Sequence, residues 1–565
     1  MAKNKLGVSD GSGVVHDDTS DMPILKVSEL PGSPADRDSR YRGQLPTREK
    51  KYLKGHEKVV LIKASKSELP PRPLTPLEVA VKAANADTPD EIGLKGPTVA
   101  SINPIENSSA RSRYQAQHGR DDLQAANDLA EDFPVLVDTT ILTLSKSQGV
   151  ENEENLPGVP FRQERVGSII LLDLHKDDRL GRKFSAIAGW GYPRYTSADA
   201  PGSYINLIAR RWRQDPSYLI RHNYDARDGA TYALTKGFER SVQWLMDRTD
   251  ENPEGFVEYK KYAYGGMRNQ GWRDSASAMV HIDGSWANSD YGLAAIDVQG
   301  ISFDAFRNAA KIYREFDLLK NEKKADELDE RAWNIQRRVI HDGWADTHFV
   351  SGWDRSENNY SRQIASKTSA IGRLLRSGIL KTDNPETHEK LRQTIRGLMA
   401  PDMLTRWGLR TLSSDELGYV PFSYHIGPIW PHDTNEIAAG MSDHGYFGLD
   451  RIISATTTHL HQTTGVFYEH ISGDDSDEPN VPQRDTYVYS ELYDELYLWE
   501  QVPPIAQTWA ATTEYAKERR LSVNPQHAID PAKLSFEKQI WTNLSDSVKK
   551  TVFLYEPELA LALSA

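Results

Sequence analysis

The sequence predicts an all-α protein in which paired helices close into a double ring and the connecting loops gather at one end. Hydrophobic residues recur at helical spacing from about residue 105 onward, whereas segments with the alternation of a strand are few. The residues suited to binding and chemistry fall in the loops between the helical segments, where functional residues tend to lie. A solenoid of stacked repeats is the alternative, but no repeat of fixed period runs along the chain.

Ten segments carry the helical pattern, with apolar residues three and four positions apart, and predict ten or eleven helices. The first segment ends at Gly149 and the ninth at Gly465, and glycine commonly terminates helices. In chain order the segments span residues 121–149, 201–214, 228–248, 301–319, 324–344, 361–380, 386–401, 432–445, 448–465 and 502–520. Strand signals are limited to residues 167–174 and 344–353.

Composition divides the chain into three parts. Residues 1–104 are rich in Pro, Gly, Ser and Asp, and we expect them to form a low-complexity arm that is largely extended or disordered. Residues 105–521 hold the helical segments and form the expected main domain. Residues 522–565 are expected to form a C-terminal tail that packs on this domain.

Charge and motif content exclude several functional classes. The net charge of −13 argues against nucleic-acid and anionic-membrane partners, which require a basic surface. The chain has no cysteine, no glycine-rich phosphate loop and no H-E-x-x-H motif, so thiol chemistry, nucleotide binding and zinc hydrolysis are not expected. His459 and His461 are interpreted as structural, the acidic loop 472–480 as a solvated turn rather than a calcium site, and no cofactor is expected. With no secretory signal and no long apolar stretch, the chain is expected to be soluble and cytoplasmic.

Three loop regions combine aromatic rings with hydrogen-bonding side chains. Sugars stack their apolar faces on Trp and Tyr, and their hydroxyl groups bond to Asp, Arg, Asn, Gln and His, so the combination favours a carbohydrate pocket. A single loop Trp is more often a packing residue, and the prediction depends on the three regions occurring together. The substrate-binding candidates are Trp190, Tyr192, Arg194, Asp199, Arg268, Asn269, Gln270, Trp272, Arg273, Tyr424, His425, Trp430, His432 and Asp433, and Trp407 lies in the third region.

Cleavage of a glycoside requires two carboxyl groups, one protonated and one ionised. Asp274 is the candidate acid, because a carboxyl close to the indole of Trp272 is expected to have a raised pKa. Its alternative role is to cap a helix over residues 275–281, and spacing alone leaves the two open. Glu469, which lies between aromatic residues and a histidine, is the candidate base, and the alternatives are Glu436, Glu491, Glu495 and Glu500.

At these residues the chain resembles the helical-barrel glycoside hydrolases that include glycogen-debranching amylo-alpha-1,6-glucosidases and bacterial glycogen-debranching-like proteins. The motifs are NQGWRDS at residues 269–275 and WGLRTLSSDELGYVPFSYHIGPIWPHD at 407–433, with weaker matches at 118–126, 139–149 and 296–300. The resemblance covers roughly residues 110–515 and implies an (α/α)6 barrel, inversion at the anomeric carbon, Asp274 as general acid and Glu469 as general base. The chain departs from the family in ASAMVH after the motif serine, and in the low-complexity arm that replaces an N-terminal β-sandwich.

The expected function is therefore an inverting, exo-acting glycoside hydrolase for an alpha-linked glucoside or oligosaccharide, with carbohydrate as its partner. The alternatives are a related barrel hydrolase (a trehalase, a processing-type alpha-glucosidase or a mannosylglycerate-type hydrolase), a catalytically inactive carbohydrate-binding protein, or a helical interaction scaffold. Inversion predicts that the carboxyl groups of Asp274 and Glu469 lie about 6.5–9.5 Å apart.

Overall fold

The computed structural model describes most of the chain from residue 116 to the C-terminus. The predicted N-terminal arm, residues 1–104, lies outside the described residues. The described ranges are 116–146, 148, 169–173, 194–195, 197–226, 229–260, 268–358, 361–421, 423–465, 467–479, 486–490, 495–499, 508–523 and 531–565.

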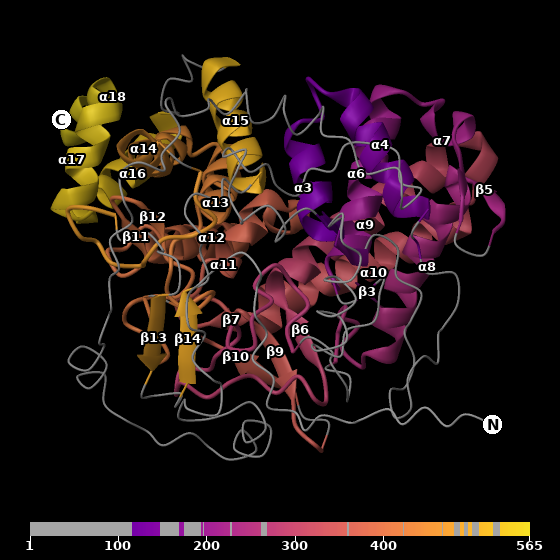
Figure 1. Ribbon diagram of the computed structural model, residues 1–565, viewed down its shortest axis with the longest axis horizontal. Helices are drawn as coiled ribbons and strands as arrows, with labels where there is room; N and C mark the ends of the chain where they lie inside the picture. Colours follow the sequence, from indigo (N-terminus) through magenta and orange to yellow (C-terminus); the bar gives the residue numbers. More distant parts are fainter. Residues whose placement is uncertain are drawn as a thin grey trace, which may run out of the picture.

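Helices dominate these ranges (Figure 1). The α-helices are α3 (Gly119–Asp128), α4 (Pro134–Lys146), α6 (Ala200–Gln214), α7 (Tyr218–Arg221), α8 (Leu234–Glu251), α9 (Ile296–Glu315), α10 (Glu322–Asp342), α11 (Ala370–Arg373), α12 (Pro385–Leu398), α13 (Pro431–Asp443), α14 (Phe447–Thr464), α15 (Thr508–Val523), α16 (Pro531–Asn543), α17 (Asp546–Tyr555) and α18 (Pro557–Ser564). Short 3-10 turns are η6 (Asp317–Leu319), η7 (Leu374–Arg376) and η8 (Gly378–Leu380).

The helices form two concentric rings. Helices α3, α6, α9, α11, α13 and α15 contact one another in this order, and α15 contacts α3, so the inner ring is closed. Each of the first five inner helices is followed by an outer helix that packs against it, and these are α4, α8, α10, α12 and α14. After α15 the chain continues into α16–α18, and α17 packs against α14 at the side of the ring opposite α4 and α8 (Figure 1). The predicted (α/α)6 toroid is confirmed.

Three predicted helical segments differ from the structure, and in one of them, 228–248, residues Thr231–Ala233 form strand β5 before α8 begins at Leu234. The segment 121–149 contains two helices, because Pro134 lacks a backbone N–H and starts α4 at its first position. In the segment 361–380, the first residues form strand β10 (Ser361–Ile364) instead of a helix, and they pair with the strand β9 (Gly352–Arg355). Sheet pairing outweighs the weak helical pattern there, and the helix begins only at Ala370.

The strands are short and connect the helices. β9 lies between β10 and β6 (Leu293–Ala295), and β6 leads directly into α9, with Ala295 opposite Gly352. β6, β9 and β10 lie together at the lower side of the helices in Figure 1. The remaining pairs are β1 (Ala116–His118) with β2 (Ile169–Asp173), β2 with β3 (Arg194–Tyr195), β4 (Asn223–Asp225) with β5 (Thr231–Ala233), β7 (Trp344–Ala345) with β8 (His348–Phe349), β11 (Leu404–Thr405) with β12 (Gly408–Leu409), and β13 (Thr486–Ser490) with β14 (Glu495–Trp499).

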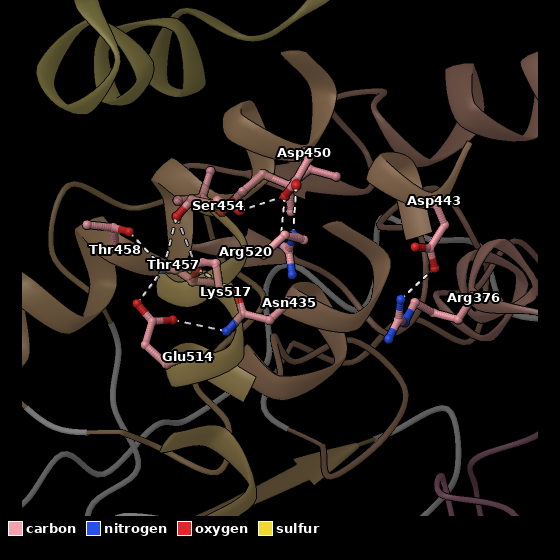
Figure 2. Close-up of polar contacts among 12 residues, drawn as sticks. Arg376, Asn435, Asp443, Asp450, Ser454, Thr457, Thr458, Glu514, Lys517 and Arg520 are labelled. Atoms are coloured by element: carbon pink, nitrogen blue, oxygen red, sulfur yellow. Dashed lines mark hydrogen bonds and ion pairs between the residues drawn. The ribbon is translucent and has the colours of Figure 1, made fainter. Parts of the chain in front are cut away.

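Helix α13 lies at the centre of the packing, since every residue from Pro431 to Met441 is buried. Polar groups in its contact with α14 and α15 are paired with one another (Figure 2). The amide of Asn435 donates to Glu514 at 3.0 Å, and Glu514 also forms an ion pair with Lys517, which is 1% exposed. Because the buried charges have partners within the contact, they can be accommodated between the helices.

No helix among the described residues is long and apolar enough to span a membrane.

Gly440 allows the close approach of α13 to η7. A Cβ atom added at Gly440 would lie 2.5 Å from Cβ of Leu375 and 3.1 Å from its carbonyl carbon. In contrast, a Cβ at Gly397 in α12 would lie 3.6 Å from Cδ of Lys367, which is an ordinary contact.

We therefore predict that Gly440→Ala lowers the free energy of unfolding by about 2–3 kcal/mol, because two inner-ring segments must separate. Gly397→Ala is the matched control, and its effect should be neutral or stabilising by up to about 1 kcal/mol, since Ala favours the helix. Urea unfolding followed by tryptophan fluorescence measures both. Equal effects of the two substitutions would contradict the proposed packing.

Candidate active site

The N-termini of five inner helices, α3, α6, α9, α13 and α15, meet at one end of the ring. Four of them carry a buried aspartate at their start: Asp122 lies in the first turn of α3, Asp199 precedes α6, Asp297 lies in the first turn of α9, and Asp433 lies in the first turn of α13. A helix N-terminus stabilises negative charge, so these positions suit carboxylates. The ring topology thus concentrates acidic side chains at this end.

Arg120, at the start of α3, joins three of the segments that meet there. Its Nε donates to Oδ2 of Asp199 at 2.6 Å, and its Nη1 lies 3.4 Å from Oδ2 of Asp274. Its Nη2 donates to the hydroxyl of Ser197 at 3.3 Å and to the carbonyl of Gln270 at 3.2 Å. Arg120 therefore holds the loop of Asp274 against the N-termini of α3 and α6.

Asp274 lies in an irregular loop, and no helix follows it, since residues 275–280 form turns and an isolated bridge. The alternative that Asp274 caps a helix is therefore wrong. The loop is held by Asn269, whose amide donates to the carbonyl of Ser275 at 2.6 Å, and by the backbone N–H of Ser275, which donates to Nδ1 of His425 at 3.2 Å. The side chain of Asp274 remains 29% exposed.

Three indoles form one cluster beside this loop. Trp272, Trp430 and Trp509 are each 3% exposed, and Trp509 comes from the first turn of α15. His432 stacks on Trp509 with ring centroids 3.7 Å apart, and Trp272 meets the rings of Trp430 and His432 edge to face. The motifs 269–275 and 407–433 are thereby brought together, as the sequence predicted.

Arg373 of α11 lies under this aromatic cluster. Its Nε donates to Oδ1 of Asp433 at 2.7 Å, and its guanidinium lies 4.7 Å from the ring centre of Trp272. Several buried polar atoms here have no hydrogen-bond partner among the described residues, and such atoms suit a ligand rich in hydroxyl groups. They are Nη2 of Arg373, Oδ2 of Asp433, Oδ1 of Asp199 and the indole nitrogens of Trp272 and Trp509.

Glu469 is linked to the same cluster through Tyr424 and is 2% exposed. The hydroxyl of Tyr424 donates to its Oε1, and the ring of Tyr424 packs at 4.9 Å from Trp430. The neighbouring residue, His425, bonds to the backbone next to Asp274. One dipeptide, Tyr424–His425, therefore contacts the segments that carry both predicted carboxyl groups.

Burial sets the charge of the titratable groups around the site. Desolvation, followed by the nearby charge of Arg273, lowers the pKa of His425 well below its usual value, and desolvation lowers the pKa of His470 to about 3. Both imidazoles are therefore neutral at pH 7. Because Nδ1 of His425 accepts a hydrogen bond, its Nε2 carries the proton, and this buried N–H has no partner among the described residues.

The acids respond in the opposite direction. Desolvation raises the pKa of Asp121 to about 6, against the opposing charge of Arg120, and desolvation also raises the pKa of Asp297 despite the nearby Arg373 and Arg273. The site thus combines buried carboxyl groups with raised pKa values and neutral histidines, a pattern common in catalytic centres.

The alternatives to Glu469 are placed differently or not described. Glu436 lies inside α13, where its Oε1 accepts from Gln124 at 2.9 Å and its Oε2 from Arg376 at 3.1 Å, so both of its oxygens are engaged. Glu495 lies in β14, but its side chain is not among the described ones. Glu491 and Glu500 lie outside the described residues.

Some of the predicted binding residues contact other parts of the chain. Gln270 and Arg273 are buried and donate hydrogen bonds to backbone carbonyl groups. Gln270 donates to that of Lys260, and Arg273 donates to that of Thr411. The guanidinium group of Arg268 lies 5.5 Å from the ring centre of Trp286.

The remaining candidates from the loop regions lie either in another cluster or outside the described side chains. Trp407 stacks on His459 and belongs to a different apolar cluster from the three indoles, and Trp190 and Tyr192 lie outside the described residues. Arg194 is described only as part of the backbone of β3.

Four residues of the site were not predicted from the sequence as binding residues. Arg120 and Asp297 lie in the weaker motifs 118–126 and 296–300, where an acid at a helix start was the available signal. Arg373 and Trp509 lie inside predicted helical segments and carry no local signal.

No cluster of three or more metal-ligating side chains occurs among the described residues. In the acidic loop 472–480, Asp475 and Asp477 lie 3.4 and 2.7 Å from Arg406, so this arginine balances part of the charge that a calcium ion would require.

Sequence comparison identifies a family for most of the ring. Residues 139–499, well over half of the chain, match the mannosylglycerate hydrolase MGH1-like glycoside hydrolase domain. No curated protein sequence matches the chain significantly.

Structure comparison finds distant similarities. The mannosylglycerate hydrolase of GH63 from Thermus thermophilus, in complex with Tris and D-glycerate, has a TM-score of 0.49 at 15% identity, and the alignment covers 79% of this chain and 99% of that chain. The structure of that enzyme in complex with glucose has a TM-score of 0.48 at 14% identity, and the alignment covers 79% of this chain and 99% of that chain. Neutral trehalase Nth1 from Saccharomyces cerevisiae has a TM-score of 0.45 at 10% identity, and the alignment covers 79% of this chain and 78% of that chain. The fold assignment depends on the closed helix ring and the family assignment on the matched domain.

The neutral state of His470 predicts a dependence of stability on pH. The folded pKa of about 3 lies below that of an unfolded histidine, about 6.5, so the unfolded chain binds an additional proton as the pH falls through this window. The free energy of unfolding of the wild type should therefore fall between pH 7 and pH 5. In His470→Gln this fall should be smaller by about 1–2 kcal/mol.

Urea unfolding at both pH values measures this difference. The exposed His341 of α10 is the control, since His341→Gln should leave the pH dependence unchanged. An unaltered pH dependence in His470→Gln would contradict the assignment of a neutral imidazole.

Proposed function

The chain belongs to the mannosylglycerate hydrolase MGH1-like glycoside hydrolase family and is a glycosidase, and from this premise we propose its mechanism and substrate class. We propose an inverting, exo-acting hydrolase in which Asp274 is the general acid and Glu469 the general base. The substrate proposed is a small alpha-linked glycoside of mannosylglycerate type. The family match favours this substrate over the glycogen-debranching one that the sequence motifs suggested.

The observation that supports the proposal is that Tyr424–His425 contacts both Glu469 and the segment of Asp274. The hydroxyl group of Tyr424 contacts Glu469 and the imidazole of His425 contacts the backbone beside Asp274, so both acids are connected to one aromatic cluster. A sugar ring on this cluster would have one carboxyl group on each face. Inversion requires this arrangement, with room for water on one side.

The surroundings of Asp274 suit an acid that gives up a proton. Arg120 approaches Asp274 at 3.4 Å but pairs with Asp199 at 2.6 Å, so its charge is matched chiefly by Asp199. Asp274 would transfer its proton to the glycosidic oxygen as the bond from this oxygen to the anomeric carbon breaks. Its partial exposure leaves space for the departing group.

Glu469 would act from the opposite face. It would take a proton from a water molecule whose oxygen forms the new bond to the anomeric carbon. The hydrogen bond from Tyr424 fixes the direction of its carboxylate. The unpartnered groups of His425, Arg373, Trp272 and Trp509 would bind the hydroxyl groups of the terminal sugar.

The first test of the function uses purified protein and a panel of alpha-linked glycosides. We expect cleavage of mannosylglycerate or glucosylglycerate in preference to trehalose, maltose and isomaltose, and proton NMR should detect the sugar with the inverted anomeric configuration. Asp274→Asn and Glu469→Gln should each lower kcat by at least about a thousandfold, and Asp290→Asn, at an exposed aspartate, should not.

Full activity in either variant would refute the site, and a product of retained configuration would refute the inverting mechanism. Saturable binding of the sugars without any turnover would instead favour a carbohydrate-binding protein.

The second test concerns Tyr424. In Tyr424→Phe the ring still packs against Trp430, but the hydrogen bond to Glu469 is lost, so we expect kcat to fall about 10- to 100-fold with KM nearly unchanged. Tyr515→Phe is the control, because its hydroxyl group bonds to Asp132 on the exterior. A change confined to KM would show that Tyr424 acts in binding and not on the base.

A further inference from the structure

A cavity of about 250 Å³ lies between η8, α12, the turn after α13 and the start of α16. It is separate from the candidate active site, because α13 begins with His432 and Asp433 at that site and ends at Asp443, next to the cavity. Over the 13 residues of this helix the distance is about 18 Å.

Basic side chains surround the cavity, although the protein as a whole has a net charge of −13. Lys381, His388, Arg392, His444 and Lys533 all line it. Among the described residues, no carboxylate pairs with the ammonium groups of Lys381 or Lys533, whereas Lys367 and Lys390 form ion pairs with Asp402 and Glu386. Neither lysine that lines the cavity is therefore neutralised by a described carboxylate, and the Lys533 ammonium lies 4.4 Å from the ring centre of Tyr446.

Two of the acids nearby are already bound to other cations. Glu389 lies 3.2 Å from Arg392 and 3.3 Å from Arg396, so one carboxylate is shared by two guanidinium groups. Asp443 forms an ion pair with Arg376 (Figure 2). A third acid, Glu537 of α16, lies near Tyr446 and accepts from the backbone N–H of Gly448 at 3.0 Å, but no described carboxylate lines the cavity itself.

Two further features favour an anion. Helices α12 and α16 both begin at the cavity, with His388 and Lys533 in their first turns, and helix N-termini attract negative charge. Nε2 of His444 is buried and has no hydrogen-bond partner among the described residues. Since burial lowers the pKa of His444 to about 4, its imidazole is neutral at pH 7 and can bond to a hydroxyl group of a ligand.

The cavity also has an apolar wall suited to a short carbon skeleton. Tyr446 and Phe536 are 3% and 7% exposed and line it together with Leu391. The volume is below the range of about 300–1,000 Å³ that is usual for drug-sized ligands, which excludes large cofactors. The space fits a ligand of monosaccharide size.

We propose that this cavity binds a small phosphorylated metabolite, with its phosphate between Lys381, Lys533 and Arg392 and its carbon skeleton against Tyr446 and Phe536. The proposal goes beyond the glycosidase activity and does not depend on it, since no residue of the candidate active site takes part.

The test is isothermal titration calorimetry of the full-length protein, with glucose 6-phosphate, inorganic phosphate and glucose each titrated separately. We expect saturable binding of glucose 6-phosphate with a Kd below about 1 mM, weaker binding of inorganic phosphate, and loss of affinity at high salt. The double variant Lys381→Glu/Lys533→Glu should weaken the binding of glucose 6-phosphate at least tenfold, and the neutral Lys381→Gln/Lys533→Gln should also weaken it.

The matched control is Lys320→Glu/Lys323→Glu, which changes the net charge equally at exposed positions before and within α10. It should retain the wild-type affinity, and thermal unfolding of all variants verifies that they fold. The proposal is overturned if no saturable binding occurs, if the cavity variants bind as tightly as wild type, or if the control loses affinity to the same extent. Equal affinity for glucose and glucose 6-phosphate would also overturn it, because the phosphate would then contribute nothing.

Discussion

The buried ion pair between Arg120 and Asp199 fixes the end of the ring where the candidate site lies. Both side chains are almost fully buried, at 10% and 3% exposure, so desolvation opposes their charges. The cost is offset because Arg120 also donates to Ser197 and to the backbone of Gln270, which leaves few of its N–H groups without partners. One side chain therefore joins the start of α3, the start of α6 and the loop of Asp274.

The other interactions of the site build on this arrangement. Once the loop 268–275 is held at Gln270, the backbone of Ser275 can meet His425, and Trp272 can meet Trp430 and His432. Arg373 and Asp433 close the same cluster from α11 and α13. The site thus depends on a closed ring, because its groups come from helices at both ends of the chain.

This dependence explains how far the sequence could be interpreted. The loop motifs that contain Asp274, Trp430 and Asp433 stand out because their residue types are unusual for solvent-exposed loops, and the helical periodicity predicted the ring. Arg373 and Trp509 could not be found, since each looks like any residue of an amphipathic helix until ring closure brings them together 136 positions apart. Glu469 and Glu436 could be separated only by their hydrogen-bond partners, which local sequence does not encode. The domain boundaries at 104 and 521 stay predictions.

The balance of charge gives the two proposed catalytic carboxyl groups different environments. The guanidinium groups of Arg120 and Arg373 are paired with Asp199 and Asp433, two acids that lie at helix N-termini. Glu469 is buried and accepts a hydrogen bond from a neutral hydroxyl group, whereas Asp274 is partly open to water. A bound sugar would cover Asp274 and remove that water, which disfavours its charged form at the moment when it must hold a proton. We infer that substrate binding itself favours the protonated form that Asp274 needs as the acid. Glu469, the base, already has its hydrogen bond from Tyr424 before the substrate binds.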